Sequence, residues 1–226
     1  MRAHDDHGPD RLSPRNGAAV IEETIPDIVI RRLPVYVRTL RELQSRGATS
    51  ISSDELADQI GVTAAQIRRD LSYFGRFGKQ GKGYDAERLA EEIAHILRLD
   101  RQWDVALAGF GNLGQAIVHY QGFVPASFRI AAIFDRNEDA IGREVDGVVV
   151  KSPDEMTDEI ARLGIKMGII AVPAHAAQEI TDAMIAGGVD AILNYAPVVL
   201  RTPARVTVRE VDPVSAMQSM TYYLDN

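Results

Sequence analysis

The chain has 226 residues, a length for which two domains are the usual expectation, each large enough to bury a core of its own. With 46% hydrophobic and 25% charged residues it has an ordinary globular composition, and its formal net charge of −7 excludes a uniformly basic coat while leaving room for one basic patch. Cysteine is absent, which excludes disulfides, thiolate metal sites and cysteine nucleophiles.

Residues 1–24 are predicted to be a disordered extension, because polar, charged and turn-forming residues follow one another there without periodicity. His4 and His7 lie in this segment without a framework of further ligands, so we expect two solvated histidines and no metal site. The segment lacks the apolar region and cleavage site of a signal peptide, and no apolar run reaches transmembrane length. We therefore expect a cytoplasmic protein without a membrane partner.

Residues 25–85 are predicted to form a winged helix-turn-helix domain that begins with an amphipathic helix. Between Pro26 and Gly47, apolar residues recur at helical spacing, namely Ile28, Leu33, Val37, Leu40 and Leu43. A second helix is expected to begin at a cap on Ser53 and to end at Gly61.

A third helix, starting at Thr63, is predicted to be the DNA-reading helix, with Ile67 and Leu71 turned inward. The glycine-rich basic stretch FGRFGKQGKGY follows and is typical of a hairpin wing. From residue 62 to residue 84 there are five Lys or Arg and one acid, Asp70, which reverses the overall charge balance. We expect Asp70 to orient a neighbouring arginine or to cap a turn. The candidate DNA-contacting residues are Thr63, Gln66, Arg68, Arg69, Tyr73, Arg76, Lys79 and Lys82.

An alternative interpretation of this basic surface stays open, because winged-helix modules also serve as dimerisation domains whose basic face is merely solvated. Residues 86–100 read as a linker helix to the next domain.

Residues 101–211 are predicted to form a Rossmann-type, doubly wound parallel sheet, so that the chain as a whole is an α/β protein. The apolar run VALA turns into a loop that matches G-x-G-x-x-G at Gly109, Gly111 and Gly114. In such loops a tight turn, close approach to a pyrophosphate and close packing of helix on strand each exclude a larger side chain. The first backbone N–H groups of the following helix are expected to face the phosphates.

An acid in the position that binds ribose strengthens this interpretation. The apolar run 128–134 ends on Asp135, about 21 residues after Gly114. Asp135 predicts NAD and NADH as ligands, whereas Arg136 leaves open whether the 2′-phosphate of NADP(H) is tolerated. A doubly wound sheet without a ligand is the alternative.

The rest of this domain alternates as a doubly wound sheet requires. Strands are expected at 148–150, 167–172, 191–193 and 205–211, and helices at 153–163 and 176–186. Because ligands bind at the carboxyl ends of such strands, the candidate dinucleotide-binding residues are Gly109, Phe110, Gly111, Asn112, Leu113, Gly114, Asp135, Arg136, Val172, Pro173, Asn194, Ala196 and Pro197. Residues 212–226 are predicted to form a terminal amphipathic helix.

Four stretches together resemble the Rex family of redox-sensing transcriptional repressors. They are QIRRDLSYFGRFGKQGKGY, VALAGFGNLG, IFDR and ILNYAPVVL. The resemblance implies a homodimer that binds a palindromic operator in double-stranded DNA, senses the ratio of NADH to NAD, and leaves the operator when NADH binds. It also implies that the terminal helix is exchanged between subunits. The chain departs from the family at Pro213, where an apolar or aromatic residue is commoner.

Tyr120 and Asp212 are our candidate switch pair, joined by a hydrogen bond in one ligand state only; a packed tyrosine and a helix-capping aspartate are the alternative. An NAD-dependent oxidoreductase is a rival function, but the pocket edges offer only His175 and Tyr195 as acid or base, and too little chain remains for a substrate domain. We therefore expect no enzymatic activity. A DNA-binding regulator that senses another nucleotide-like ligand, such as coenzyme A, is a further alternative.

Overall fold

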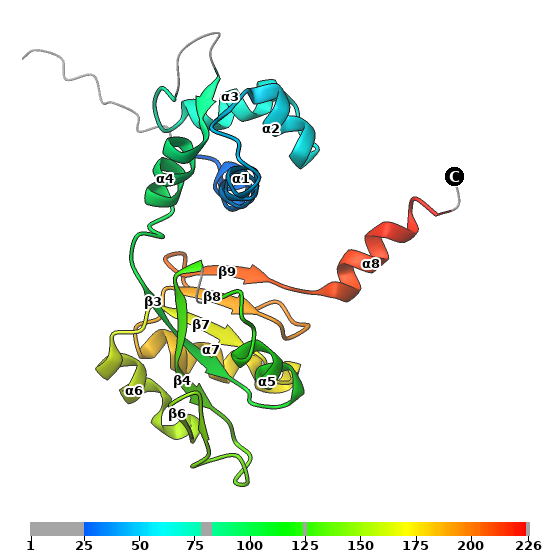
Figure 1. Cartoon of the computed structure of the whole chain (residues 1–226). Coiled ribbons are helices and arrows are strands. Elements are labelled where there is room, and N and C mark those ends of the chain that lie inside the picture. The colour runs from blue at the N-terminus through cyan, green and yellow to red at the C-terminus, as the bar shows by residue number, and fades with distance from the viewer. Residues whose placement is uncertain (1–24, 78–82, 124–125, 225–226) are drawn as a thin grey trace, which may run out of the picture. The chain divides into compact units, whose positions relative to one another are not determined.

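The computed structural model describes residues 25–77, 83–123 and 126–224 (Figure 1). The chain divides into two compact units, of which the first ends at Ile93 and the second begins at Ala94. The predicted wing lysines Lys79 and Lys82, and the histidines His4 and His7, lie outside the described residues. In the described part of the chain, no helix has the length and apolar character needed to cross a membrane.

The N-terminal unit consists of helices and one small two-stranded sheet. Strands β1 and β2 pair antiparallel, with Ser50 opposite Asp85; each has two residues, too few for β1 to be predicted from periodicity. The elements are α1 (Asp27–Ser45), β1 (Ser50–Ile51), α2 (Ser53–Ile60), α3 (Ala64–Ser72), β2 (Tyr84–Asp85) and α4 (Ala86–Ile96).

At the start of α1, the residue that faces the core is one position later than predicted. Val29 is buried, whereas Ile28, which we expected in the core, is 56% exposed. Ile28 and Leu33 are five residues apart, which turns them about 140° from each other around a helix, so both cannot face the core. The remaining buried residues of α1 are Leu33, Tyr36, Val37 and Leu40.

The ends of α2 and α3 follow from local hydrogen bonds. Ser52, and not Ser53 as predicted, caps α2: its hydroxyl accepts a hydrogen bond from the Glu55 N–H, while the Glu55 carboxylate accepts one from the Ser52 N–H. Ser53 is instead buried, with its hydroxyl 3.2 Å from that of Tyr84. The predicted end of α2 at Gly61, in the left-handed conformation, is confirmed.

A buried carboxylate fastens α3 to α1. Asp70 accepts two hydrogen bonds from the Arg32 guanidinium, at 2.6 and 2.8 Å, one from the Tyr36 hydroxyl at 2.6 Å and one from the Gln66 amide at 2.7 Å. Burial by itself raises the pKa of a carboxyl group, but these hydrogen bonds outweigh it, so the pKa of Asp70 lies below its usual range. Asp70 thus orients an arginine, as expected, but this arginine belongs to α1 and is not a neighbour of Asp70 in the sequence.

The C-terminal unit is a doubly wound sheet in which all strands but one run parallel, in the order β5-β6-β4-β3-β7-β8-β9. The exception is β5, which pairs antiparallel with β6. The elements are β3 (Trp103–Ala108), α5 (Asn112–Val118), β4 (Phe128–Phe134), β5 (Glu144–Val145), β6 (Val148–Lys151), the 3-10 turn η2 (Pro153–Glu155), α6 (Met156–Leu163), β7 (Met167–Ile170), α7 (Ala174–Ala186), β8 (Ala191–Asn194), β9 (Thr207–Glu210) and α8 (Pro213–Thr221).

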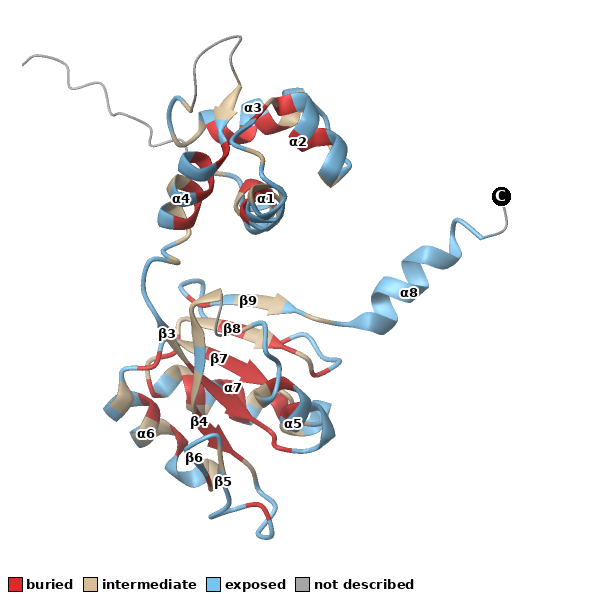
Figure 2. Ribbon diagram, viewed as in Figure 1, coloured by how far each residue is buried: buried red, intermediate tan, exposed pale blue. Residues whose placement is uncertain are grey.

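Both faces of this sheet are covered, and its central strands are buried (Figure 2). Ala106 and Ala108 of β3 face a core that contains side chains of α6 and α7, whereas Val105 and Leu107 face a core that contains Ile117 of α5. The chain moves outward from β3 through β4 to β6 and then returns to place β7 on the other side of β3. This reversal between β3 and β7 is the position at which doubly wound sheets bind ligands.

The Asp70 cluster leads to a prediction about stability. Asp70→Asn should destabilise the N-terminal unit by about 3 kcal/mol at pH 7, because it leaves the partly buried Arg32 without its carboxylate. The folded pKa of Asp70 is depressed, so its contribution is fully present above the unfolded pKa of about 4 and is lost as the pH falls through the folded pKa.

Urea unfolding at several pH values tests this. Wild type and Asp70→Asn should converge in free energy of unfolding in strong acid, and Asp58→Asn, which removes an exposed carboxylate of α2, should match wild type at pH 7. A difference between wild type and Asp70→Asn that stayed constant from pH 7 into strong acid would contradict the assignment.

Candidate functional site

In the loop after β3, two glycines lie so close to neighbouring backbone carbonyl groups that a side chain at either position would not fit. Gly109 has φ +95°, and a Cβ there would lie 2.5 Å from the Ala171 carbonyl oxygen. A Cβ on Gly114 would overlap the carbonyl oxygen of Gly109. Gly111, in contrast, has ordinary backbone angles and open space within 4 Å of its Cβ position. The first and third glycines therefore serve packing, and the second leaves a free surface.

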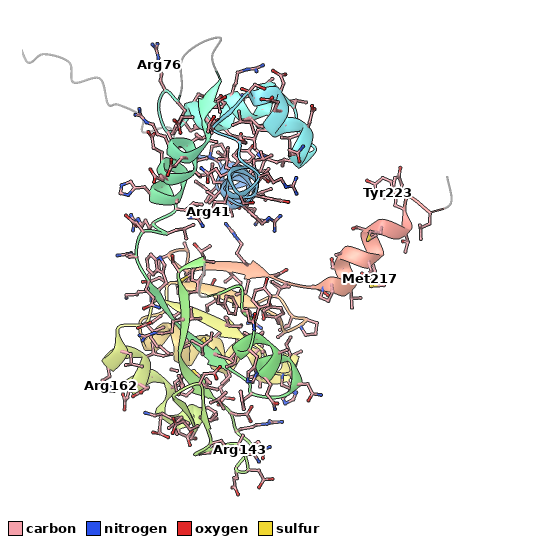
Figure 3. The ribbon with its side chains drawn as sticks, in the orientation of Figure 1. Arg41, Arg76, Arg143, Arg162, Met217 and Tyr223 are labelled. Carbon is pink, nitrogen blue, oxygen red and sulfur yellow. The ribbon has the colours of Figure 1, made fainter. Side chains whose placement is uncertain are left out.

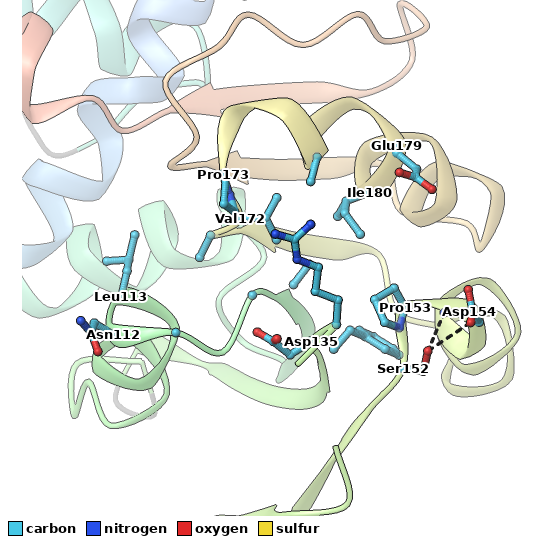
Figure 4. A pocket seen from close by; sticks show the side chains of 17 residues that line it. Asn112, Leu113, Asp135, Ser152, Pro153, Asp154, Val172, Pro173, Glu179 and Ile180 are labelled. Carbon is cyan, nitrogen blue, oxygen red and sulfur yellow. Dashed lines mark hydrogen bonds between the residues drawn. The ribbon is translucent and has the colours of Figure 1, made fainter. Parts of the chain in front are cut away.

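That free surface borders a cavity of about 730 Å³, within the usual range for ligand pockets (Figure 4). The cavity lies among the glycine loop, the end of β4, the segment after β6 and the start of α7. Predicted dinucleotide-binding residues that line it are Gly109, Gly111, Asn112, Leu113, Asp135, Arg136, Val172 and Pro173. An open, side-chain-free cradle at the start of a helix fits a pyrophosphate.

Asp135 ties this loop to the end of β4. One carboxylate oxygen accepts a hydrogen bond from the Phe110 N–H at 2.5 Å, and the other accepts one from the Asn137 N–H at 2.7 Å. Each oxygen of a carboxylate has two lone pairs, so Asp135 can still accept hydrogen bonds from ribose hydroxyls. The acid is thus held in place before a ligand arrives.

Other predicted residues lie near the cavity but do not line it. The Phe110 side chain is buried in the core beside α5, and Gly114 packs behind the loop. Asn194 is the buried last residue of β8, and its amide donates a hydrogen bond to the Val198 carbonyl and accepts one from the Ala196 N–H, both at 2.9 Å. Asn194 and Ala196 therefore shape the loop that carries Pro197, and a ligand role for these residues stays a prediction.

The prediction missed a group of cavity residues from two elements. Ser152, Pro153 and Asp154 follow β6, and the rule that ligands bind at the carboxyl ends of strands would have included them. Glu179 and Ile180 come from the second turn of α7, and no local pattern marks them as ligand contacts.

The proposed DNA-contacting surface is centred on α3. Arg68 and Arg69 are exposed. Arg76, which lies beyond the helix and is labelled in Figure 3, is exposed as well. Thr63 caps α3 by accepting a hydrogen bond from the Gln66 N–H at 3.1 Å. Gln66 is half-buried, and its amide N–H₂ donates one hydrogen bond to Asp70, so its second N–H and its carbonyl oxygen are left for other partners. Tyr73 is half-buried.

The candidate switch residues have local roles within the single chain. Tyr120 is 62% exposed and packs edge-to-face on Phe123, with ring centroids 5.3 Å apart. Asp212 caps α8 by accepting a hydrogen bond from the Val214 N–H at 2.9 Å. These are the packing and capping roles that we gave as the alternative, and the pairing of Tyr120 with Asp212 stays a prediction.

His175 and Tyr195, the candidate acid or base residues, do not line the cavity. The described part of the chain also contains no cluster of three or more histidine and carboxylate side chains able to hold a metal ion.

Two family models match the chain. The model described as "Putative DNA-binding protein N-terminus" matches residues 24–72, and the model described as "CoA binding domain" matches residues 100–198. The first match covers α1 to α3, and the second covers the sheet from β3 to β8 with its glycine loop.

Relatives and solved structures cover most of the chain. A protein of Roseiflexus sp. (strain RS-1), "Redox-sensing transcriptional repressor Rex", is 54% identical over 89% of this chain and 92% of its own. A crystal structure of RSP in complex with β-NAD⁺ and operator DNA has a TM-score of 0.84 at 39% identity, covering 89% of this chain and 93% of RSP. RSP in complex with β-NADH has a TM-score of 0.81 at 37% identity, covering 89% and 95%.

The different roles of the glycines can be separated by substitution. Gly114→Ala should lower the melting temperature strongly, because its Cβ would overlap the Gly109 carbonyl oxygen. Gly111→Ala should melt within about 2 °C of wild type, because its Cβ meets open space and its φ suits alanine. Differential scanning calorimetry checks both, and equal melting temperatures of the two variants would contradict the packing described for the loop.

Proposed function

The chain belongs to the Rex family of redox-sensing transcriptional repressors, and we propose that it binds a palindromic operator as a dimer and leaves it when NADH binds. The relatives are named as repressors, and we assign no catalytic reaction to the chain. The observation that carries the proposal is the pairing, in one chain, of a cavity beside a glycine loop with an exposed basic helix. As a repressor it would work in the cytoplasm, where both operator DNA and the nicotinamide dinucleotides are present.

The cavity supports the ligand half of the proposal. The pyrophosphate would lie against Gly111 and the first N–H groups of α5, and the adenosine ribose would bind Asp135. NAD and NADH differ by a hydride and one positive charge, so discrimination must arise at the nicotinamide ring. Apolar walls from Ala171 to Pro173 would disfavour the oxidised, cationic ring by desolvation.

Helix α8 supports the dimer. Its side chains Val214, Met217 and Met220 are 60%, 68% and 62% exposed, and none of its residues is buried (Figure 2). A nine-residue helix with no buried side chain lacks the packing that stabilises short helices in water. We infer that α8 packs on a second copy, as the exchange of this helix between subunits requires.

Asp135 should decide which dinucleotide binds. Asp135→Ala should lower NADH affinity at least about tenfold, because it loses the ribose acceptor and the tie to the Phe110 N–H together. Calorimetric titration with NADH and NADPH measures these affinities. Gly111→Ala, which should keep the fold, should lower the affinity for NADH as well. Wild-type affinity in Asp135→Ala would refute the placement.

Arg68 and Arg69 should divide between base and phosphate contacts. Loss of a bidentate base contact should cost roughly 1–3 kcal/mol and relax specificity at one base pair, whereas loss of a phosphate contact should weaken all sequences alike and flatten the salt dependence. Arg143→Ala removes an exposed arginine of the C-terminal unit and serves as the matched control. Unchanged operator affinity in both Arg68→Ala and Arg69→Ala would remove α3 from the interface.

We further propose that Tyr120 and Asp212 couple NADH binding to operator binding. They would do so through a hydrogen bond between their side chains that forms in only one of the two states, with or without NADH. The Tyr120 side chain is exposed, and capping of α8 uses only one carboxylate oxygen of Asp212. Tyr120→Phe and Asp212→Ala should each bind operator and NADH but lose the effect of NADH on operator affinity, measured as the ratio of operator affinities with and without NADH. Full coupling in both variants would refute the pair.

A further inference from the structure

The side-chain amide of Gln66 is held in one orientation by a buried carboxylate. Its Nε2 donates a hydrogen bond of 2.7 Å to Oδ1 of Asp70, which lies four residues later in α3. The pKa of Asp70 is lowered, so at neutral pH its carboxylate is ionised and can only accept hydrogen bonds. The opposite orientation of the amide would place the Gln66 carbonyl oxygen against a carboxylate oxygen. The nitrogen therefore stays at Asp70, and the carbonyl oxygen is left for another partner.

The same carboxylate is fully engaged within the N-terminal unit. Oδ2 accepts hydrogen bonds from Nε of Arg32 and from the Tyr36 hydroxyl, both at 2.6 Å. Oδ1 accepts a second bond from Arg32, at 2.8 Å, besides the one from Gln66. A carboxylate has about four lone-pair sites, and four donors occupy them here. Asp70 is 0% exposed, so water does not compete, and the orientation of the Gln66 amide is set before DNA binds.

Gln66 stands at the part of α3 that would meet the edges of the bases. It is the third residue of the helix, and the two residues before it, Ala64 and Ala65, have short side chains that leave its amide accessible. The exposed Arg69 follows three residues later, on the same side of the helix. In helix-turn-helix proteins, residues near the start of the second helix contact base edges in the major groove.

We propose that Gln66 recognises an adenine of the operator and that Asp70 is the residue that positions it; this rests on the proposed binding of an operator by α3. The carbonyl oxygen and the second N–H of Gln66 match adenine, whose 6-amino group donates a hydrogen bond and whose N7 accepts one. Guanine presents two acceptors at the same edge, O6 and N7, and O6 would face the Gln66 carbonyl oxygen. Because Asp70 holds the nitrogen, Gln66 cannot exchange its oxygen and nitrogen to suit guanine.

The contact can be detected on the DNA as well as on the protein. Duplexes that the wild-type chain selects from a randomised pool serve as the operator, and each adenine is replaced in turn by unsubstituted purine, which keeps N7 but lacks the 6-amino group. Wild type should lose about tenfold in affinity at one adenine of each half-site. Gln66→Met, which keeps the length of the side chain but removes its polar atoms, should bind the unmodified duplex about tenfold more weakly and lose nothing further with purine at that position.

This comparison isolates recognition from stability. Any effect of purine on base pairing is shared by the two proteins and cancels between them. Gln102→Met, which changes an exposed glutamine of the C-terminal unit, is the matched control and should respond to purine as wild type does. Wild type and Gln66→Met that respond alike at every adenine would overturn the assignment of Gln66. If the proposed function itself failed, the wild-type chain would select no common sequence from the pool.

A second arm tests the role of Asp70. In Asp70→Asn the new amide offers a donor as well as an acceptor, so Gln66 is no longer held in one orientation, and the discrimination between adenine and purine should fall at least about threefold. Tyr36→Phe removes a different donor of the same carboxylate, leaves the hydrogen bond from Gln66 in place and should keep the discrimination. Circular dichroism at the assay temperature verifies that both variants are folded. Full discrimination in Asp70→Asn, or an equal loss in Tyr36→Phe, would overturn the positioning role, and Gln66→Met tests base recognition without changing Asp70.

Discussion

Close contact between backbones after β3 is the constraint on which the ligand site depends. Gly109 reaches the Ala171 carbonyl of the neighbouring strand end, and Gly114 reaches back to the Gly109 carbonyl, so α5 starts directly against the sheet. Only because these two positions lack side chains does Gly111 come to border open space. The hydrogen bond from the Phe110 N–H to Asp135 then joins the loop to the end of β4. Packing and the proposed recognition of the ligand therefore depend on the same few residues.

The parts of this site that the sequence predicts are those set by local rules. The glycine spacing and the acid after the run 128–134 report backbone geometry within one β-α-β unit, and the structure brings Gly109, Gly111 and Asp135 to one cavity. Glu179 reaches the cavity only through the packing of α7, which no short-range pattern encodes. The cap of α2 was missed by one residue because Ser52, Ser53 and Asp54, all suitable cap residues, follow one another, and the hydrogen bonds between Ser52 and Glu55 decide among them.

The two units differ in whether their side chains find partners within the single chain. In the N-terminal unit the buried Asp70 has partners on two helices, which sets α3 against α1 and leaves Arg68 and Arg69 outside. Helix α8 has no such anchoring, since its apolar side chains are exposed in the single chain. We propose that, in the dimer, a bound dinucleotide changes the packing of α8 without touching a DNA contact. Two half-sites on one face of DNA tolerate little change in the spacing of their recognition helices.

The most direct test of this account measures operator affinity of the full chain at fixed salt while the ratio of NADH to NAD is varied at constant total dinucleotide. A ligand shifts DNA binding only if its affinity differs between the bound and free forms of the protein. The account predicts that operator affinity falls as the ratio rises, and that Gly111→Ala, with its fold intact, loses this dependence. Operator affinity that stayed constant across the ratio, in a protein shown to bind NADH, would contradict it.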